Sequence, residues 1–394
     1  MNPQKNQIFE NCPWPFYQED ELDAVSLILR SGKVNYWTGI IGRQFEKSFS
    51  SWCGTKYSHS LANGTLALDL AYRSLHLSNE DEIITTPRTF IATASTISVL
   101  GLKPVFADVD YNSGNITAKT IEPLINSRTK AISVVHLGGW PANILEIKEL
   151  ARTYNLKLIE DCSQAHGAKI NGISVGSFGD VGTWSFCQDK IMSTGGEGGM
   201  ITTSDEVISE FITSWRDHGK DINKLLENSQ STSFRYIHDS LGLNYRMTEI
   251  QSKIGDIQLK KLPVWHQKRK ENAYALANAL KNCKNLRIPM PASSYEHAWY
   301  KFYAYLKPDA LAEGWDRNRI LFELNQEKIP VFSGSCSEIY LEKCMRKNNP
   351  QKPLLNARSL GNNSLMFLVH PTINKLSLEL YISGILNVLN KAQR

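Results

Sequence analysis

The sequence has no apolar run approaching the roughly 20 residues that a membrane-spanning helix needs. Its first residues, MNPQKNQIFENCPWPF, are polar and lack the apolar core of a secretory signal. The seven cysteines are scattered and form no C-x-x-C pair, so neither a disulfide framework nor a zinc site is indicated. These absences predict a cytoplasmic protein with reduced thiols, no membrane association and no metal.

Basic residues are too dispersed for a nucleic-acid-binding protein. The net charge of +5 is modest for 394 residues, and no basic arm interleaved with aromatic residues occurs. The densest basic run, KKLPVWHQKRK (260–270), fits the solvated face of a helix. Neither the G-x-G-x-x-G fingerprint nor a P-loop is present. The composition is that of an ordinary globular enzyme, and its mild positive charge tolerates an anionic small substrate.

Short apolar runs alternate with helical patterns between residues 56 and 203. Seven runs are predicted as buried strands: YSHSLA, DEIITTP, KPVFADVD, KAISVVHL, LKLIED, VGTWSF and MITT. Helical patterns lie between several of them, at Leu66–Leu75, Ile91–Leu102 and Ile144–Tyr154. This alternation predicts an α/β fold with right-handed βαβ units and a mostly parallel sheet covered on both faces. In such sheets, ligands bind at the carboxyl ends of the strands.

The composition changes after Met247. A long helical stretch runs to about Leu280, and Pro263 is expected to kink or split it. Beyond it, HAWYKFYAYL (297–306) alternates like an antiparallel strand, and further helical and strand segments follow. We therefore predict an N-terminal arm and large α/β domain over residues 1–262, and a smaller α+β domain over residues 263–394.

The first segment that indicates chemistry is LANGTLALDLAY. Gly64 follows a short strand and opens a helix, whose unpaired N–H groups and dipole form an anion site. Gly64 would allow close approach of the backbone, and Thr65 would add a hydroxyl donor. By itself, the segment is equally compatible with an ordinary strand-to-helix turn.

A second segment, LKLIEDCSQAHGA, places Asp161 at the carboxyl end of a predicted strand. A carboxylate there can hold a proton on a heterocyclic nitrogen, because its negative charge favours the cationic form of its partner. Gln164 and His166 follow in a tight loop. By themselves, Asp161 is also compatible with a helix cap and His166 with a buried structural histidine.

The third segment, SFCQDKIMSTGGEGGMITT, places Lys190 between a buried strand and four glycines. A lysine desolvated there is less strongly held in its charged form, so its free amine can attack an aldehyde. The glycines would let the chain pass close to a bulky cofactor. Phe90, in TTPRTFIATAS, follows another strand end and is placed to stack on a flat ring. By themselves, Lys190 also fits a surface position and Phe90 a core position.

Together these segments match the needs of one cofactor, pyridoxal 5′-phosphate (PLP). The phosphate is assigned to the glycine turn and a serine, the pyridine nitrogen to the aspartate, the aldehyde to the lysine and the ring face to the phenylalanine. The residues so assigned are Gly64, Thr65, Ser185, Asp161, Lys190 and Phe90.

The chain resembles the DegT/DnrJ/EryC1/StrS family of PLP-dependent nucleotide-sugar aminotransferases over nearly its full length. The similarity is carried by GKVNYWTGIIGRQFEKSFS, LANGTLALDLAY, EDCSQAHGA, GSFGDVGTWSFCQDKIMSTGGEGGM, RDHGK and GLNYRMTEIQ. It implies the PLP-dependent transferase fold type I, as in aspartate aminotransferase, with a large sheet domain of the seven-stranded type. It also implies a homodimer with shared active sites. By resemblance, Lys190 and Asp161 are catalytic. Gln164 would lie near the ring hydroxyl, and Asn244 would contact the phosphate in the neighbouring subunit.

The resemblance further implies a ping-pong transfer of an amino group from L-glutamate to a nucleotide-linked keto sugar. The favoured acceptor is C4 of dTDP-4-keto-6-deoxyglucose, for O-antigen, lipopolysaccharide or another surface glycan. Amination at C3, or of a UDP- or GDP-linked sugar, is the alternative. A PLP-dependent dehydratase would carry histidine in place of Lys190, and a non-catalytic protein of this fold would not need the reactive amine. Residues expected near the substrate lie in GSCSEIY and LVHPT or are Arg88, His218, Lys220, Arg246 and Tyr340.

Overall fold

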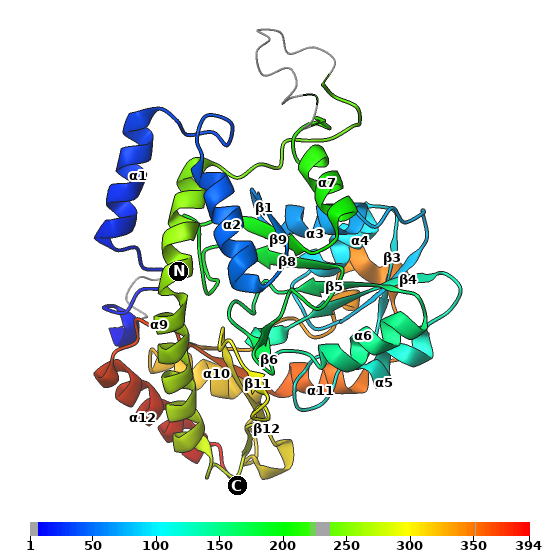
Figure 1. Cartoon of the computed structure of the whole chain (residues 1–394). Helices are drawn as coiled ribbons and strands as arrows, with labels where there is room; N and C mark the ends of the chain where they lie inside the picture. Colours follow the sequence, from blue (N-terminus) through cyan, green and yellow to red (C-terminus); the bar gives the residue numbers. More distant parts are fainter. Residues whose placement is uncertain (1–6, 222–223, 225–236, 351) are drawn as a thin grey trace.

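The computed structural model describes residues 7–221, 224, 237–350 and 352–394 (Figure 1), so residues 1–6 of the polar N-terminal run lie outside it. Its centre is a seven-stranded sheet with the order β1-β9-β8-β5-β4-β2-β3. The strands are β1 (Tyr57–Leu61), β2 (Glu82–Thr85), β3 (Lys103–Phe106), β4 (Thr129–Val135), β5 (Lys157–Asp161), β8 (Val181–Ser185) and β9 (Gly199–Thr203). Each of the seven runs predicted as strands overlaps one of these strands, although β4 and β9 begin one residue before the predicted run, and the predicted α/β class is confirmed.

The direction of the strands brings several strand ends together. Strands β3, β2, β4, β5 and β8 are parallel, whereas β9 is antiparallel to both of its neighbours, β8 and β1. Because β1 and β8 are both antiparallel to β9, β1 runs in the same direction as β8. The carboxyl ends of β1, β2, β5 and β8 therefore lie at one edge of the sheet, where the predicted site residues follow or end the strands.

Helices cover both faces of this sheet. They are α3 (Gly64–Arg73), α4 (Ala92–Val99), α5 (Ala118–Ile121), α6 (Ile144–Thr153) and α7 (Glu206–Trp215). Ile83 and Ile159 pack with α3, α4 and α7, while their neighbours Ile84 and Leu158 pack with α5 and α6. Alternate side chains of each strand are thus buried in opposite layers, which explains the continuous apolar runs. Across the described ranges, no helix combines the length and the apolar character that crossing a bilayer requires.

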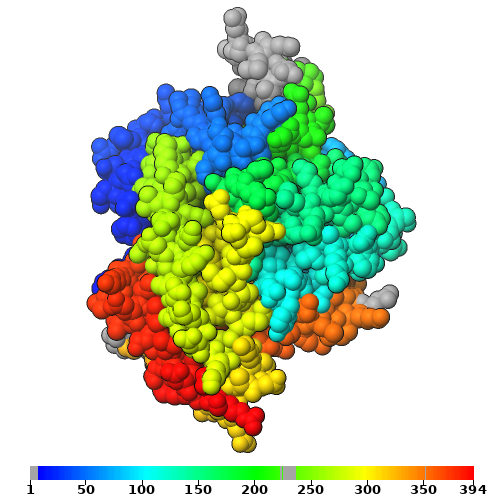
Figure 2. Space-filling view, turned by 60° about the horizontal axis from the view of Figure 1, so that its bottom comes forward, coloured from blue at the N-terminus to red at the C-terminus, as the bar shows by residue number. Residues whose placement is uncertain are grey.

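The long helix α9 (Glu249–Leu280) corrects one prediction, because it continues through Pro263 as a single helix. A proline inside a helix removes a hydrogen bond and costs about 3 kcal/mol. Burial on both sides of Pro263, at Leu259 and Leu262 before it and at Leu276 after it, offsets that cost. In Figure 2, α9 (yellow-green) runs along the surface between the blue N-terminal and the red C-terminal segments. The predicted boundary at 262/263 falls inside this helix, so the division of the chain there stays a prediction.

The C-terminal part has its own sheet and core. Its sheet has the order β10-β12-β14-β13, and Phe9 and Cys12 of the N-terminal arm pack into its core. The strands and helices are β10 (Leu286–Arg287), β12 (Phe302–Leu306), β13 (Val331–Phe332), β14 (Ser364–Phe367), α10 (Arg317–Gln326), α11 (Leu355–Asn363) and α12 (Lys375–Lys391). A further small sheet, β11-β6-β7, was not predicted; its strands are β6 (Lys169–Ile170), β7 (Ile173–Ser174) and β11 (Tyr295–Glu296).

Only the second half of the predicted strand 297–306 is a strand in the structure. The first half turns away to contact the large sheet domain: Ala298 N–H donates to the carbonyl of Gly139 at 2.8 Å, and Lys301 N–H to that of Gly138 at 3.3 Å. Trp299 adopts a left-handed φ of 49°. A local alternation of residues could not show this turn, because its hydrogen-bond partners come from another part of the chain.

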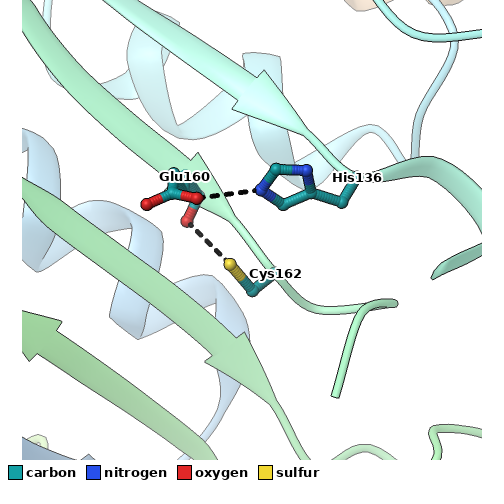
Figure 3. Close-up of side chains that lie close together, drawn as sticks. All are labelled: His136, Glu160 and Cys162. Atoms are coloured by element: carbon teal, nitrogen blue, oxygen red, sulfur yellow. Dashed lines mark hydrogen bonds and ion pairs between the residues drawn. The ribbon is translucent and has the colours of Figure 1, made fainter. Parts of the chain in front are cut away.

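His136, Glu160 and Cys162 lie together at the carboxyl ends of β4 and β5 (Figure 3). His136 Nδ1 accepts the N–H of Ala142 at 3.0 Å, so its Nε2 carries the proton and donates to Glu160 at 3.1 Å. Three backbone N–H groups of the 176–179 loop also donate to the Glu160 carboxylate, at 2.8 to 2.9 Å. Both imidazole nitrogens and both carboxylate oxygens are therefore engaged in a hydrogen-bond network that ties this loop to β5.

Replacing Glu160 by glutamine should lower the free energy of unfolding by about 2–3 kcal/mol, because charge-assisted hydrogen bonds are lost and an amide N–H₂ meets backbone donors. Urea denaturation followed by circular dichroism measures this. Glu149→Gln, which removes only an exposed pair with Arg152, is the matched control and should leave the midpoint unchanged. Destabilisation of the unmodified protein by a chelator would contradict the assignment as a hydrogen-bond network.

Candidate active site

Two adjoining cavities open at the carboxyl edge of the sheet. The first, of about 570 Å³, is lined among others by Gly64, Thr65, Phe90, Asp161, Gln164, Ser185 and Lys190. These are seven of the eight residues predicted to bind the cofactor. The second, of about 820 Å³, shares Phe90, Gln164 and Lys190 with the first. It is also lined by Ser335 of the GSCSEIY segment and Leu368 of the LVHPT segment, in the C-terminal part.

The predicted anion site is formed by the start of α3 and the end of β8. Asn63 caps the helix by accepting the N–H of Leu66 at 2.9 Å, and the first N–H groups of the helix, at Gly64 and Thr65, have no carbonyl within the helix to bond. A side chain at position 64 would bring its Cβ within 2.6 Å of the Cβ of Ser185. The helix start and the Ser185 hydroxyl are therefore neighbours, and together they are suited to a phosphate.

Asp161 is a buried carboxylate at the end of β5, with only 4% of its surface exposed. Its oxygens accept from the Thr93 hydroxyl at 2.9 Å and from the N–H of Ser163 at 3.1 Å. Within the described ranges, no lysine, arginine or histidine forms an ion pair with it. A buried charge with only neutral partners is costly, so Asp161 fits a cation supplied by a ligand, such as a protonated ring nitrogen.

Gln164 and Phe90 lie at the boundary between the two cavities. Gln164 Oε1 accepts the N–H of Gly138 at 2.7 Å, which holds its amide in place. Phe90 is 67% exposed, which is high for so large an apolar side chain. An exposed ring at a cavity wall is available to stack on a planar ligand.

Lys190 lies in the loop after β8, and its side chain is 16% exposed. Its Nζ lies 3.3 Å from Asp189 Oδ1 and 5.3 Å from the centroid of the Tyr300 ring. The Tyr300 hydroxyl also donates to Asp189. Burial opposes the charge of Asp189, but the neighbouring Lys190 and the hydrogen bond from Tyr300 hold the pKa of this carboxyl below its ordinary value. The amine thus enters the cavity between a charged carboxylate and an aromatic ring.

The glycines after Lys190 have a different role from the predicted one. Among the residues that the structure describes, none of the four glycines lines either cavity. Gly196 adopts a left-handed φ of 107°, and a Cβ at Gly199 would lie 2.3 Å from the carbonyl oxygen of Asn63. These glycines allow a tight turn and let β9 pack directly against the start of α3. They therefore help to hold the anion site in position.

The N-terminal arm contacts the lysine loop, which the motifs did not indicate. Trp14 Nε1 donates to the carbonyl of Lys190 at 2.9 Å, and the Tyr17 hydroxyl to the Ser193 hydroxyl at 3.2 Å. From the other side, Gln258 of α9 accepts the N–H of Ser193 at 2.8 Å. The loop that carries the amine is therefore held by two distant segments, and no local sequence signal marks either contact.

The substitution Trp14→Phe should raise the dissociation constant of PLP by about 2- to 10-fold, because it removes one hydrogen bond to the lysine loop. Equilibrium titration of the apoprotein with PLP, followed by absorbance, measures the effect. The matched control is Trp215→Phe, because Trp215 Nε1 has no hydrogen-bond partner among the described residues. Equal PLP affinity of the Trp14 variant and the unmodified protein would remove this contact from the site.

Asn244 is the one predicted cofactor residue that does not line these cavities. It is exposed and forms an isolated β-bridge with Asp217, whose side chain pairs with Lys220 and Arg246. His218 follows Asp217 and has a left-handed φ of 62°. None of these residues lines either cavity of the single chain, and only for Asn244 was a role at a second subunit predicted.

Arg88 and Tyr340 were predicted near the substrate, but neither lines the cavities. Arg88 is fully buried, donates to the Tyr305 hydroxyl at 2.9 Å and faces the ring of Tyr303. Tyr340 is buried against Phe106. Both positions were inferred from residue type alone, and packing between the large sheet and the C-terminal part places them in the interior.

A mostly parallel sheet with a lysine amine, a buried carboxylate and an anion site at its carboxyl edge defines a PLP-dependent enzyme of fold type I. The chain belongs to the DegT/DnrJ/EryC1/StrS aminotransferase family, whose model matches residues 15–379. It is therefore a PLP-dependent aminotransferase.

Similar proteins agree with this assignment. The structure of an aminotransferase from Psychrobacter cryohalolentis is 45% identical, with a TM-score of 0.94 over 96% of this chain and 99% of that one. The dTDP-3-amino-3,6-dideoxy-alpha-D-galactopyranose transaminase of Aneurinibacillus thermoaerophilus is 38% identical over 74% of this chain and 76% of its own length. The UDP-N-acetyl-3-dehydro-alpha-D-glucosamine 3-aminotransferase of Acidithiobacillus ferrooxidans is 38% identical over 71% of this chain and 70% of its own length.

Proposed function

We propose that this enzyme transfers the amino group of L-glutamate to a keto sugar linked to a nucleotide. The observation that carries the proposal is the position of Lys190 at the boundary of two cavities, of about 570 and 820 Å³. The first contains the anion site and Asp161, and the second leaves room for a substrate beyond the amine. The two curated relatives described above are named for the amination of nucleotide-linked sugars, which supports this substrate class.

The residues of this chain would act on bound PLP as follows. PLP supplies an electron sink for the transfer. The start of α3 and Ser185 hold its phosphate, and Phe90 and Gln164 hold the ring. Asp161 keeps a proton on the ring nitrogen, because its carboxylate has no other cationic partner among the described residues. Lys190 would hold the cofactor through its aldehyde group and, when its amine is free, would take and return the proton of the substrate carbon.

The position on the sugar has two candidates. We predict C4 of a dTDP-linked 4-keto-6-deoxyglucose, with a surface glycan such as O-antigen or lipopolysaccharide as the destination. Amination at C3 is the second candidate, because both relatives carry position 3 in their names, one with a dTDP-linked and one with a UDP-linked sugar.

We further propose a homodimer in which Asn244 contacts the phosphate bound by the other subunit. Asn244 lies outside the cavities of its own chain, and its neighbours Leu241 and Leu243 are apolar side chains exposed by 85% and 51%. Such exposure is typical of a surface that another chain covers. A cytoplasmic location is supported by the seven cysteines, all of which are free.

A screen of dTDP-, UDP- and GDP-linked 3- and 4-keto sugars with L-glutamate tests the function. The formation of 2-oxoglutarate should depend on one of these sugars, and NMR of the amino sugar identifies the aminated carbon. Glutamate consumption that no keto sugar supports would contradict the proposed acceptor.

A further inference from the structure

The larger cavity contains a second amine, Lys301, to which the roles above assign nothing. Lys301 lines this cavity together with Lys190, Asp189 and Tyr300. Its Nζ lies 4.7 Å from the centroid of the Tyr300 ring, and Nζ of Lys190 lies 5.3 Å from the same centroid. Both amines therefore lie beside the same aromatic ring, and Lys301 is close to the amine of Lys190.

The backbone holds Lys301 at this place. Its N–H donates to the carbonyl of Gly138, in the turn that also bonds Gln164. The buried guanidinium of Arg269, on α9, donates to the carbonyls of Trp299 and Tyr300 at 3.4 Å each. The left-handed φ of 49° at Trp299 is a costly conformation for a bulky residue, and such conformations persist where the surroundings enforce them. The position of Lys301 is thus determined by contacts from several elements.

Lys301 has no counter-ion in the described part of the chain. No carboxylate there lies within 4.0 Å of its Nζ, although its side chain is only partly exposed. Other partly buried lysines differ in this respect: Lys261 pairs with Asp20 and Glu21, and Lys220 with Asp217. A desolvated ammonium without a partner is costly, so the site is suited to an anion that arrives with a ligand.

The charges around Lys301 also favour an anion. Two carboxylates, Asp189 and Glu342, line this cavity, and Asp189 is already engaged by Lys190 and Tyr300. Burial is the largest cause that lowers the pKa of Lys301 to about 8; Asp189 raises this pKa, and the nearby positive charges of Arg269 and Lys190 lower it. An incoming negative group would be attracted by this excess of positive charge and would restore the protonated form of Lys301.

We propose that Lys301 binds a carboxylate of a substrate beside the amine of Lys190 and thereby contributes to substrate specificity. The inference rests on the proposed function, because it names a chemical group of the substrates of that same site. In a nucleotide-linked sugar, the diphosphate is separated from C3 or C4 by the sugar ring. An amino acid, in contrast, carries a carboxylate on the carbon that bears the reacting nitrogen. A carboxylate, from L-glutamate or from an acidic keto sugar, is therefore the anion expected so near Lys190.

The two half-reactions of the PLP-loaded enzyme test this binding role separately. The reaction with L-glutamate alone and the reaction of the aminated enzyme with a keto sugar alone are each followed by the absorbance of the cofactor. The variant Lys301→Met should raise the dissociation constant of L-glutamate by at least about tenfold, the effect expected for a charged hydrogen bond. The rate constant at saturation should stay within about threefold, since Lys190 is unchanged. Lys307→Met, an exposed position at the end of β12, is the matched control.

The outcomes identify the source of the carboxylate. Weaker binding of L-glutamate assigns it to the amino donor. Weaker binding of a nucleotide-linked keto uronic acid only, with L-glutamate and a neutral keto sugar unaffected, assigns it to an acidic acceptor. The proposal would be overturned if the affinities for L-glutamate and for the acidic sugar were both unchanged. It would also be overturned if the affinity for the neutral keto sugar fell as much as the affinity for the carboxylate-bearing substrate. If the unmodified enzyme aminates no keto sugar, the proposed acceptor is wrong, but the glutamate half-reaction still reports on Lys301.

Binding of 2-oxoglutarate to the borohydride-reduced, inactive holoenzyme gives a readout without turnover. Calorimetry should show that the affinity for 2-oxoglutarate falls as the pH rises through about 8, because Lys301 loses its charge. This pH dependence should disappear in the Lys301→Met variant. The titratable groups that face Lys301 or line the same cavity are Asp189, Lys190, Arg269, Tyr300, Tyr303, Cys336, Glu342, Cys344 and His370. If Lys301→Met does not fold, Lys301→Arg should retain the affinity and Lys301→Gln should lose it. Equal affinity of these two variants would likewise overturn the proposal.

Discussion

Replacing Lys190 by alanine should lower the rate of transamination by about 10⁴-fold, at the upper end of what general acid–base groups contribute. The variant loses the amine that we propose to bind the aldehyde and to move the substrate proton. The fold should be kept, because the side chain projects into a cavity and, among the residues that the structure describes, it forms an ion pair only with Asp189. Single-turnover kinetics with L-glutamate and near-ultraviolet circular dichroism measure the two properties.

Covalent trapping separates the role of Lys190 from a general loss of activity. Borohydride reduction of the unmodified holoenzyme should fix the cofactor to the peptide that contains Lys190, as found by mass spectrometry, and the alanine variant should give no labelled peptide. Lys307→Ala, at an exposed position, serves as the control and should behave like the unmodified protein. Labelling of another lysine in the unmodified protein would refute the assignment.

Replacing Asp161 by asparagine should reduce the rate by about 10² to 10³-fold, the range seen when one electrostatic contact to a reacting system is removed from a site that excludes water. Asparagine keeps the size of the side chain and can still accept from Thr93 and Ser163, but it removes the negative charge. The ring nitrogen would then lose the group that favours its protonated form.

The absorbance of the cofactor and its titration with pH report the effect of Asp161 independently of turnover. In the asparagine variant, the spectrum of the bound cofactor should differ from that of the unmodified enzyme. The control Asp309→Asn removes an exposed carboxylate that lines neither cavity, so it should change neither spectrum nor rate. A normal rate in Asp161→Asn would mean that another group protonates the ring.

Most of the large sheet domain could be predicted from local pattern. Its strands are buried on both faces, so runs such as KAISVVHL and LKLIED are apolar throughout and are easily recognised. Residues at strand ends could be placed for the same reason. Once the strands are parallel, Asp161 and Ser185 must lie at the same edge, and the structure puts both beside the start of α3 in one cavity.

Some predictions depended on the type of a residue and not on its position at the end of a strand. These predictions were less successful. Arg88 was expected near the substrate, yet packing against Tyr303 and Tyr305 buries it. Pro263 was expected to kink or split a helix, but α9 is not split there, because the local cost of the missing hydrogen bond is smaller than the gain from burying both halves of α9. In each case a tertiary contact outweighed a local preference.

The sequence by itself determined the fold class, the seven strands of the sheet and the residues suited to PLP, because period, burial and side-chain chemistry are properties of short segments. Only the tertiary structure decided which distant residues lie around that site. Trp14 bonds the lysine loop from a position 176 residues away, and a turn at Trp299 brings Tyr300 and Lys301 beside Lys190. The physical reason is that these contacts arise from the packing of whole elements against one another, which no spacing within a single segment encodes.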